Sequence, residues 1–443
     1  MLTIPFLTQL DSRAAIKGSR DPLGVQAIWS RLGRHVVANL TTVSNSVRDF
    51  TVLLLGHYFA ERVSDEGGTE GNLATFLKWE QLAAYARTHV NGDHGYRGTE
   101  RVAKRLADGD RIRLGIDAAA QILSNQKIYG LWGLYTVPAR ASGLVQGDPT
   151  RLSEETRITV EKHLLPQLEQ QGARTARGII DRLRAKDHPL DLRDNSRDAA
   201  VIRGVAGILN KVRAGERALY REHLLHGGPA DLEPTRGTQG KQRLFAELLT
   251  ETLDEEDWTL TPRSLEKLAH RAEKRGELGS QLAHRLERIR IAELLIAPAV
   301  AFFEHVMGCN GQSPSTIAKG VRQHWGTAPR GTIDLRATQA LEPELRARSD
   351  ETNSGARWLQ LAEAFHGGHY EEAIHLVLAQ NEAVMNARSA AAWVTLQDGK
   401  LHVRFRDEQL SRLPPAKALP IYWRHAYFIE SLRIVAADLR GTR

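Results

Sequence analysis

The chain has little of what a secreted, membrane-bound or disulfide-stapled protein needs. Its 443 residues include one cysteine, Cys309, so no internal disulfide and no pair of thiolate ligands can form. The first ten residues, MLTIPFLTQL, lack a basic leader and a small-residue cleavage site, so we do not expect a signal peptide. No apolar run reaches the roughly 18 to 20 residues that cross a bilayer. We therefore expect a cytoplasmic protein without a membrane partner.

The usual sequence motifs of catalysis and cofactor binding are also missing. The stretch GTQGKQR places Gln242 where a phosphate-binding P-loop needs a hydroxyl, and no glycine fingerprint for a dinucleotide follows a strand. No G-x-S-x-G elbow is present, and a nuclease would need clustered acids in a strand-rich core. We interpret Cys309, four residues after His305, as a buried structural thiol. The sequence favours a non-catalytic protein with no cofactor and no metal, and leaves catalysis open.

Length and composition predict more than one domain. A chain of 443 residues is long for one hydrophobic core. Residues 227–242 combine Gly, Pro and Thr without apolar periodicity, which is typical of a linker. We predict an N-terminal helical domain over 1–226 and a C-terminal helical domain over 243–443.

Helical periodicity dominates the sequence, so the predicted fold class is mainly α and multi-helical. Apolar residues recur at helical spacing over 25–63, with a break near Ser44–Ser46, and again over 73–90. The period changes to two over 392–406, where Asp398-Gly399 predicts the turn of a β-hairpin. A last apolar helix is expected over 422–440, and we expect it to dock on the rest of the chain.

The net charge is +7, and arginine outnumbers lysine several-fold, which favours phosphate or carboxylate partners. The same count also fits arginines that only solvate helix faces. Residues 95–165 have the cadence of a winged-helix-like element, with a basic helix, a short strand at 111–114 and a later helix capped by Ser153. The candidate phosphate contacts in this region are Arg97, Arg101, Lys104, Arg105, Arg111, Arg113, Lys127 and Arg140.

The stretch QKIYGLWGLYTVPAR, residues 126–140, carries three aromatics spaced three apart. On one helix ending near Pro138, Tyr129, Trp132 and Tyr135 would form a single ridge beside Gly130 and Gly133. Because leucines make this helix apolar nearly all round, we interpret the ridge as core packing. A surface that stacks bases is the alternative.

Three segments, FLKWEQLAAYAR, QILSNQKIYGLWGLYTVPARASGLV and WRHAYFIESLR, resemble stretches of poorly characterised, mostly helical bacterial proteins encoded near phage-defence or restriction genes. The resemblance implies a bacterial cytoplasmic setting and a helicase, nuclease or ATPase as protein partner. It carries over no catalytic residue and no reaction.

These observations support one leading hypothesis and two alternatives. The leading one is a non-catalytic accessory subunit of an anti-phage defence or restriction-type system that binds DNA or RNA through its basic surface. The second is a purely structural helical scaffold subunit of an oligomeric complex. The third is a metal-dependent hydrolase built on His366, His369 and Glu372.

Overall fold

The structure is a computed structural model that describes residues 21–170, 175–186, 188–235, 237–346, 353–404 and 413–441. Residues 1–10 and 405–406, to which some of the sequence predictions refer, lie outside these ranges. The chain forms two compact units, each built from two separate parts of the sequence. Unit 1 comprises Met1–Val36 and Glu255–Tyr427, and unit 2 comprises Val37–Asp254 and Phe428–Arg443.

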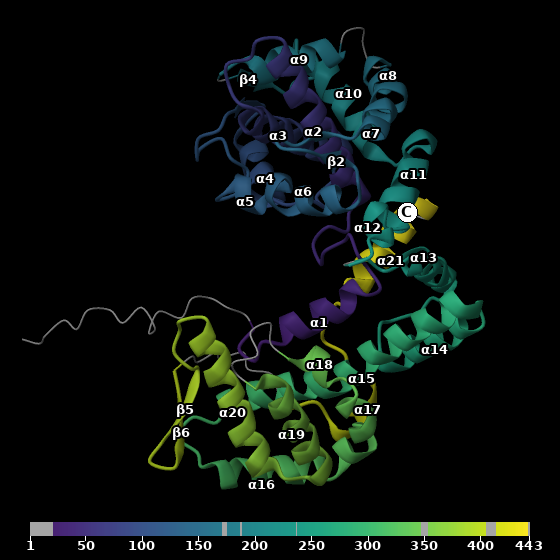
Figure 1. Ribbon diagram of the computed structural model, residues 1–443. Coiled ribbons are helices and arrows are strands. Elements are labelled where there is room, and N and C mark those ends of the chain that lie inside the picture. The colour runs from purple at the N-terminus through teal and green to yellow at the C-terminus, as the bar shows by residue number, and fades with distance from the viewer. Residues whose placement is uncertain are drawn as a thin grey trace, which may run out of the picture. The chain divides into compact units, whose positions relative to one another are not determined.

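The mainly helical class is confirmed in both units (Figure 1). Unit 1 contains α1 (Val25–Arg34), α14 (Pro262–Glu273), α15 (Gly276–Met307), α16 (Pro314–Trp325), η4 (Ala328–Gly331), α17 (Leu335–Gln339), α18 (Glu342–Leu345), α19 (Ser354–Gly367), α20 (Tyr370–Ala387), β5 (Val394–Gln397), β6 (Lys400–Val403) and η6 (Ala416–Ile421). Unit 2 contains α2 (Val47–Asp65), α3 (Asn72–Asn91), α4 (Thr99–Asp108), β1 (Arg111–Leu114), α5 (Gln126–Tyr129), α6 (Leu131–Ala141), β2 (Val145–Gln146), β3 (Arg151–Leu152), α7 (Glu154–Thr159), η1 (Val160–Leu164), α8 (Leu165–Glu169), α9 (Thr175–Arg184), β4 (His188–Asp191), α10 (Ala199–Asn210), α11 (Ala214–Tyr220), η2 (Arg221–Leu225), α12 (Pro229–Leu232), α13 (Lys241–Glu251), η3 (Thr252–Asp254) and α21 (Ile429–Arg440).

The core of unit 2 is the pair α2 and α3, with α10 packed on α3. Of the 19 residues of α2, 15 are buried, because its sequence is apolar nearly all round. Gly56 permits the close approach of this pair, since a Cβ there would lie 2.6 Å from the ring of Phe76. The side chain of Ser46 caps α2 by accepting a hydrogen bond from the N–H of Asp49. Because 13 of the 20 residues of α3 are buried as well, α2 and α3 together form the base against which α4, α5 and α6 pack.

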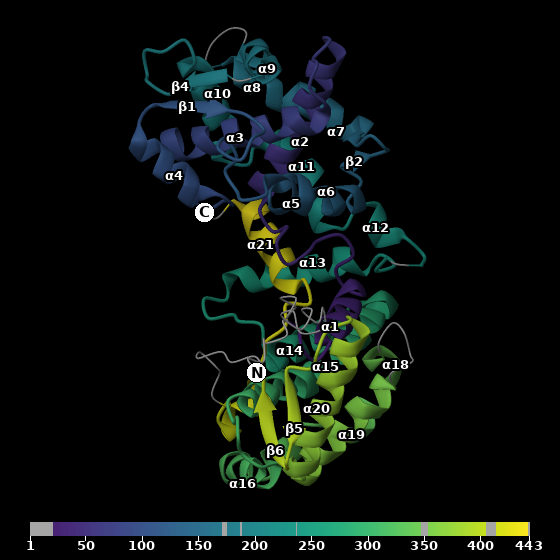
Figure 2. The ribbon, with the colours of Figure 1, turned by 90° about the vertical axis from the view of Figure 1, so that its left-hand side faces the viewer.

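The strands of the described residues form three separate antiparallel pairs. The hairpin β5–β6 is confirmed, with Asp398 at φ 52° in its turn, and it lies beside α20 (Figure 2). The winged-helix-like element expected around 95–165 differs from a winged helix in its sheet. β1 pairs with β4, a strand outside that segment, and only the short hairpin β2–β3 lies where a wing was expected.

The predicted linker, residues 227–242, is instead packed inside unit 2. It contains α12 and the first residues of α13, and the N–H of Gly240 donates to the carbonyl of Asp231. The Gln242 side chain donates to Asn39 at 2.8 Å and accepts from the N–H of Ala38 at 2.8 Å. These bonds tie the segment to a much earlier part of the chain, so composition alone misplaced the boundary.

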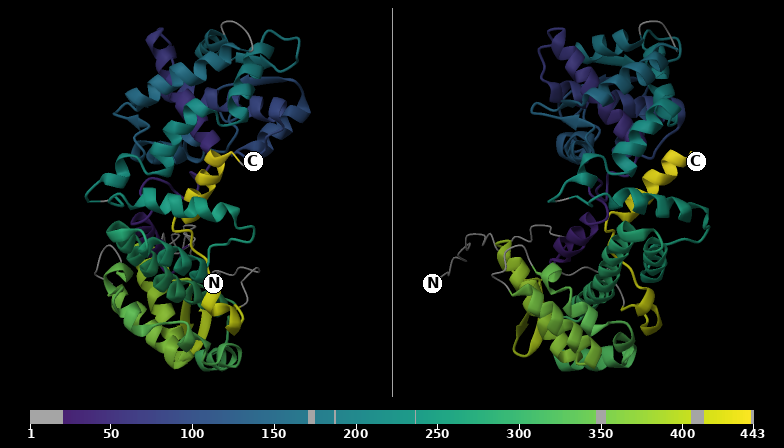
Figure 3. Two further views of the ribbon diagram at one scale, coloured as in Figure 1. Left: turned by 90° about the vertical axis from the view of Figure 1, so that its right-hand side faces the viewer. Right: turned by 45° about the vertical axis from the view of Figure 1, so that its right-hand side comes forward.

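The last helix docks as expected but begins later than predicted. α21 starts at Ile429, because Tyr427 and Phe428 adopt φ angles of 46° and 62°, which no right-handed helix allows. α21, drawn in yellow in Figure 3, packs against α13, η2 and α2.

A buried carboxylate in unit 1 holds the segment before α21 in its non-helical form. Glu293, fully buried in the middle of α15, accepts from the N–H groups of Arg424 and His425 at 2.5 and 3.0 Å. It also bonds the His425 ring at 2.8 Å and accepts from the Tyr427 hydroxyl at 2.9 Å. Burial, followed by the charge of Glu293, raises the pKa of Tyr427 well above its ordinary value, so this hydroxyl stays a donor.

No helix in the described ranges has both the length and the apolar character that a membrane crossing requires.

Candidate nucleic-acid interface and the pocket behind it

The eight basic residues predicted to contact phosphate all belong to unit 2. Seven of them are exposed, and Arg105 is half-buried. They are carried by α4, by β1, by α5, by the end of α6 and by the loop before α4. Their hydrogen bonds divide them into three groups.

Arg105 has a structural role, because its guanidinium forms hydrogen bonds within unit 2. Its guanidinium donates to the Tyr85 hydroxyl at 3.0 Å and to the carbonyls of Ala120 and Gln121 at 2.8 and 2.9 Å. It also donates to the carbonyl of Ala119. Arg105 thus fastens the loop 116–122 to α4, and few of its donors are left for a phosphate.

Three further arginines hold partners near the surface. Arg113 pairs with Asp117 at 2.6 Å, and Arg111 lies 3.8 Å from Asp191. Arg140 donates to the Thr150 hydroxyl at 2.7 Å and to the carbonyl of Gly147 at 3.1 Å. Exposed pairs of this kind contribute little to stability, but a bound phosphate would have to compete with them.

The other four, Arg97, Arg101, Lys104 and Lys127, form no ion pair with any residue that the structure describes. Arg101 donates to the carbonyl of Gln121 at 3.3 Å, and the N–H of Gln126 donates to the Gln121 side chain at 3.0 Å. The loop around Gln121 is therefore flanked by α4 on one side and α5 on the other. We call this region, which consists of Arg97, Arg101, Lys104 and Lys127 with Ile128 and Tyr129, the α4–α5 surface.

The predicted aromatic ridge is divided between surface and core. The single helix expected over 126–138 is wrong, because the chain breaks at Gly130, whose φ and ψ are −86° and −172°. Tyr129 is 53% exposed, whereas Tyr135 is 2% exposed and donates to Asp49. Trp132 is half-buried, with its ring 5.2 Å from that of Phe76. α6 also continues past Pro138 to Ala141, so the proline does not end it.

A buried polar network fixes the break between α5 and α6. Glu80, on α3, accepts from the N–H of Leu131 at 2.7 Å and from the side chain of Gln126 at 2.8 Å. Gln126 is fully buried and donates to the carbonyl of Leu77 at 2.9 Å, while Gln81 donates to its Oε1 at 3.1 Å. Burial raises the pKa of Glu80 to about 7. In the sequence, the available signal was that Gln81 and Gln126 are both polar. Nothing in the sequence indicates that their side chains meet.

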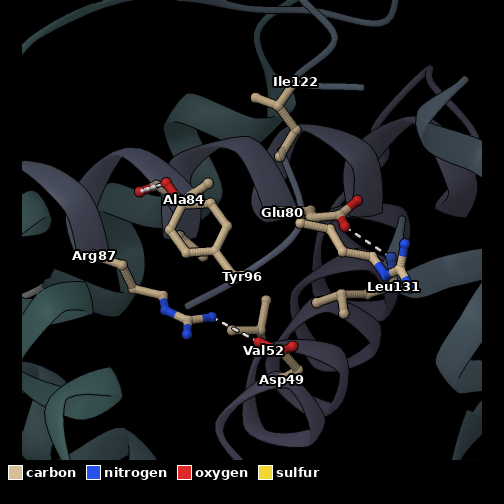
Figure 4. A pocket seen from close by; sticks show the side chains of 10 residues that line it. Asp49, Val52, Glu80, Ala84, Arg87, Tyr96, Ile122 and Leu131 are labelled. Atoms are coloured by element: carbon tan, nitrogen blue, oxygen red, sulfur yellow. Dashed lines mark hydrogen bonds and ion pairs between the residues drawn. The ribbon is translucent and has the colours of Figure 1, made fainter. Parts of the chain in front are cut away.

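A small pocket lies behind this network, lined by Asp49, Glu80, Arg87, Tyr96 and Arg97 together with apolar side chains (Figure 4). Arg87 and Asp49 form a buried ion pair at 2.7 Å, and Arg87 also bonds Asp93 at 2.7 Å. The free volume is about 20 Å³, which holds a water molecule but no metabolite. The pocket, which Arg97 of the α4–α5 surface also lines, is therefore too small to be a substrate site.

The residues of the third hypothesis do not form a metal site. His369, Glu371 and Glu372 are exposed near the start of α20, and His366 is half-buried near the end of α19. Within the described ranges, no three His, Cys, Asp or Glu side chains converge so that they could hold a metal ion. Cys309 is buried, its sulfur lies 3.9 Å from His305 Nε2, and burial raises the pKa of its thiol.

The comparisons with known proteins add no relative: no protein-family model, no curated protein and no solved structure matches this chain.

Proposed function

We propose that this chain is a non-catalytic protein that binds nucleic acid, with the phosphate backbone lying on the α4–α5 surface. The observation that carries the proposal is the set of four exposed cations, Arg97, Arg101, Lys104 and Lys127, that have no ionic partner among the described residues. Cations of this kind can release counterions from a polyanion without first giving up an internal salt bridge.

The charge of the surrounding segment supports the same function. Residues 97–140 hold eight Lys or Arg residues against four Asp or Glu residues. Asp117 is already paired with Arg113. Phosphate contacts of this type position a nucleic acid without reading its sequence, so we expect binding with little sequence preference.

The test is a fluorescence-anisotropy titration with short DNA and RNA at several salt concentrations. Replacing Arg101, Lys104 and Lys127 by Ala should weaken binding at every sequence. It should also reduce the salt slope by about 0.9 for each phosphate that the variant no longer neutralises on duplex DNA, or by about 0.7 on a single strand.

A matched control removes cations of the other unit. Lys319, Lys400 and Lys417 are exposed and, like the tested residues, form no ion pair among the described residues. The variant Lys319→Ala/Lys400→Ala/Lys417→Ala removes the same number of charges and should bind like the wild type. Equally weakened binding by the two variants would mean that net charge alone drives binding, and an unchanged triple variant would remove the α4–α5 surface from consideration.

The setting beside phage-defence or restriction genes, with a helicase, nuclease or ATPase as partner, belongs to the same proposal. Its support is the resemblance of FLKWEQLAAYAR, QILSNQKIYGLWGLYTVPARASGLV and WRHAYFIESLR to proteins encoded near such genes. Co-purification of the tagged chain with the products of neighbouring genes tests it.

A structural scaffold is the second candidate. Val137 on α6 and Leu232 on α12 are 70% and 73% exposed, more than other large apolar side chains of the described residues. Such side chains suit a contact with another protein. Stable co-purification with a partner, together with no nucleic-acid binding at moderate salt, would select this function.

A further inference from the structure

Tyr129 has an unusual position for an aromatic residue of this chain. Among the Phe, Tyr and Trp side chains of the described residues it is the only exposed one, at 53%, and Ile128 beside it is 52% exposed. The large aromatic residues that unit 2 needs for its core, such as Trp79 and Tyr85, are fully buried. Packing in the core of unit 2 therefore does not explain the exposed ring of Tyr129.

The backbone under Tyr129 is held firmly. Asn125 caps α5 by accepting from the N–H of Ile128 at 3.2 Å. Gln126, three residues before Tyr129, is anchored in the core by Leu77 and Glu80. Directly after Tyr129, a Cβ at Gly130 would lie 2.4 Å from the carbonyl oxygen of Gln126, so the turn is tight. The ring is thus carried on a fixed base, which lowers the entropic cost when a ligand stacks on it.

The charges around Tyr129 indicate what kind of ligand fits. Lys127 is exposed two residues before it, and Arg101 and Lys104 lie on α4, across the loop around Gln121. An exposed aromatic ring beside cations that form no ion pair among the described residues complements a ligand with both a flat aromatic group and a negative charge. A nucleotide within a nucleic acid has both properties.

We propose that the α4–α5 surface selects single-stranded nucleic acid, with one base stacked on Tyr129 and the adjacent phosphates on Lys127 and the cations of α4. In a duplex, the faces of the bases are covered by their neighbours, whereas a single strand offers them to an aromatic side chain. This inference rests on the proposed function and adds the class of nucleic acid and the residue that distinguishes it.

The experiment compares Tyr129→Ala and Tyr129→Phe with the wild type on a single-stranded oligonucleotide and on the matching duplex. Removal of one base stack should weaken binding of the single strand by about 5- to 150-fold. Tyr129→Phe keeps the ring and should bind within about twofold of the wild type, since stacking needs the ring face and not the hydroxyl. Neither variant should change binding of the duplex.

Salt dependence separates this inference from the function on which it rests. Tyr129→Ala should leave the salt slope unchanged, because no counterion is released by stacking, while Lys127→Ala should lower it by about 0.7 on a single strand. Wild-type affinity of Tyr129→Ala for the single strand, or equally weakened binding of the duplex, overturns the stacking role while phosphate binding stands. No binding of either nucleic acid by the wild type overturns both. Equal melting temperatures of the wild type and the variants confirm that the variants are folded.

Discussion

Glu80 Oε1 accepts a hydrogen bond from the N–H of Leu131 at 2.7 Å, so a carboxyl of α3 caps the first turn of α6. The N-cap residue of α6 is Gly130, which has no side chain to do this. The cap therefore comes from a residue 51 positions earlier in the chain. This hydrogen bond connects α3, in the buried core of unit 2, with the break that follows α5 of the α4–α5 surface.

The first prediction concerns the pH dependence of stability. Burial raises the pKa of Glu80 to about 7 in the folded chain, against 4.5 when it is exposed. Between these values the folded state keeps a proton that the unfolded state releases, so the free energy of unfolding falls as the pH rises from about 4.5 to about 7. The shift corresponds to a decrease on the order of 3 kcal/mol.

Glu80→Gln removes this titration and keeps an acceptor for Leu131. Urea unfolding of both proteins at pH 5 and pH 7.5 should show a smaller pH dependence in the variant. Identical pH dependence in the two proteins would mean that Glu80 does not titrate in this range.

The second prediction concerns Gly130. Its substitution by Ala places a Cβ 2.4 Å from the carbonyl oxygen of Gln126 and 2.7 Å from Glu80 Oε1. We expect a decrease of about 1 to 3 kcal/mol in the free energy of unfolding, because neither neighbour can move easily.

Gly207, in the helix α10, is the matched control, since an added Cβ meets nothing within 4 Å. Gly207→Ala should raise the free energy of unfolding by about 0.4 to 1 kcal/mol. Urea unfolding measures both, and a Gly130→Ala protein as stable as Gly207→Ala would contradict the tight turn.

The third prediction separates two neighbouring cations of α4. Arg105→Ala leaves the carbonyl of Ala120 without this donor and leaves that of Gln121 with Arg101 alone, so it should lower the free energy of unfolding by about 1 to 3 kcal/mol. Lys104→Ala should change stability by less than about 0.5 kcal/mol. In nucleic-acid binding at a temperature where both are folded, Lys104→Ala should reduce the salt slope more than Arg105→Ala. The reverse order would show that Arg105 leaves its carbonyl partners to contact phosphate.

The fourth prediction concerns the buried carboxylate of unit 1. Tyr427→Phe deletes the hydroxyl that donates to Glu293 at 2.9 Å and should cost about 1.5 to 3 kcal/mol, since the acceptor is buried and charged. Tyr422→Phe serves as control, because the Tyr422 hydroxyl accepts only an exposed hydrogen bond from Arg424. Urea unfolding of the two variants should differ clearly, and equal values would contradict the role of the Tyr427 hydroxyl in holding Glu293.

Local sequence pattern predicted the elements whose structure depends on local forces. The helix over 73–90, the strand 111–114, the Ser153 cap and the hairpin around Asp398-Gly399 all follow from periodicity, capping or turn chemistry. Mainly helical architecture follows from the same patterns.

The errors arose where contacts distant in sequence override local preference. Residues 422–428 have a helical pattern, but Glu293 binds three of them and holds them out of a helix. Residues 126–138 also have the pattern of one helix, which Glu80 and Gln126 interrupt. In the sequence of α4, Lys104 and Arg105 are indistinguishable by charge, and only the carbonyls around Ala120 separate a free cation from a structural one.

The discontinuous build of unit 2 has a consequence for its synthesis. The helix α21 packs on α2, α13 and η2, yet its first residue is translated 175 positions after Asp254. At about 5 to 20 residues per second, the ribosome needs roughly 10 to 35 seconds to bridge this interval. During that time the apolar faces that α21 will cover have no native partner from their own chain, so the nascent protein passes through a stage at which chaperones have a surface to bind.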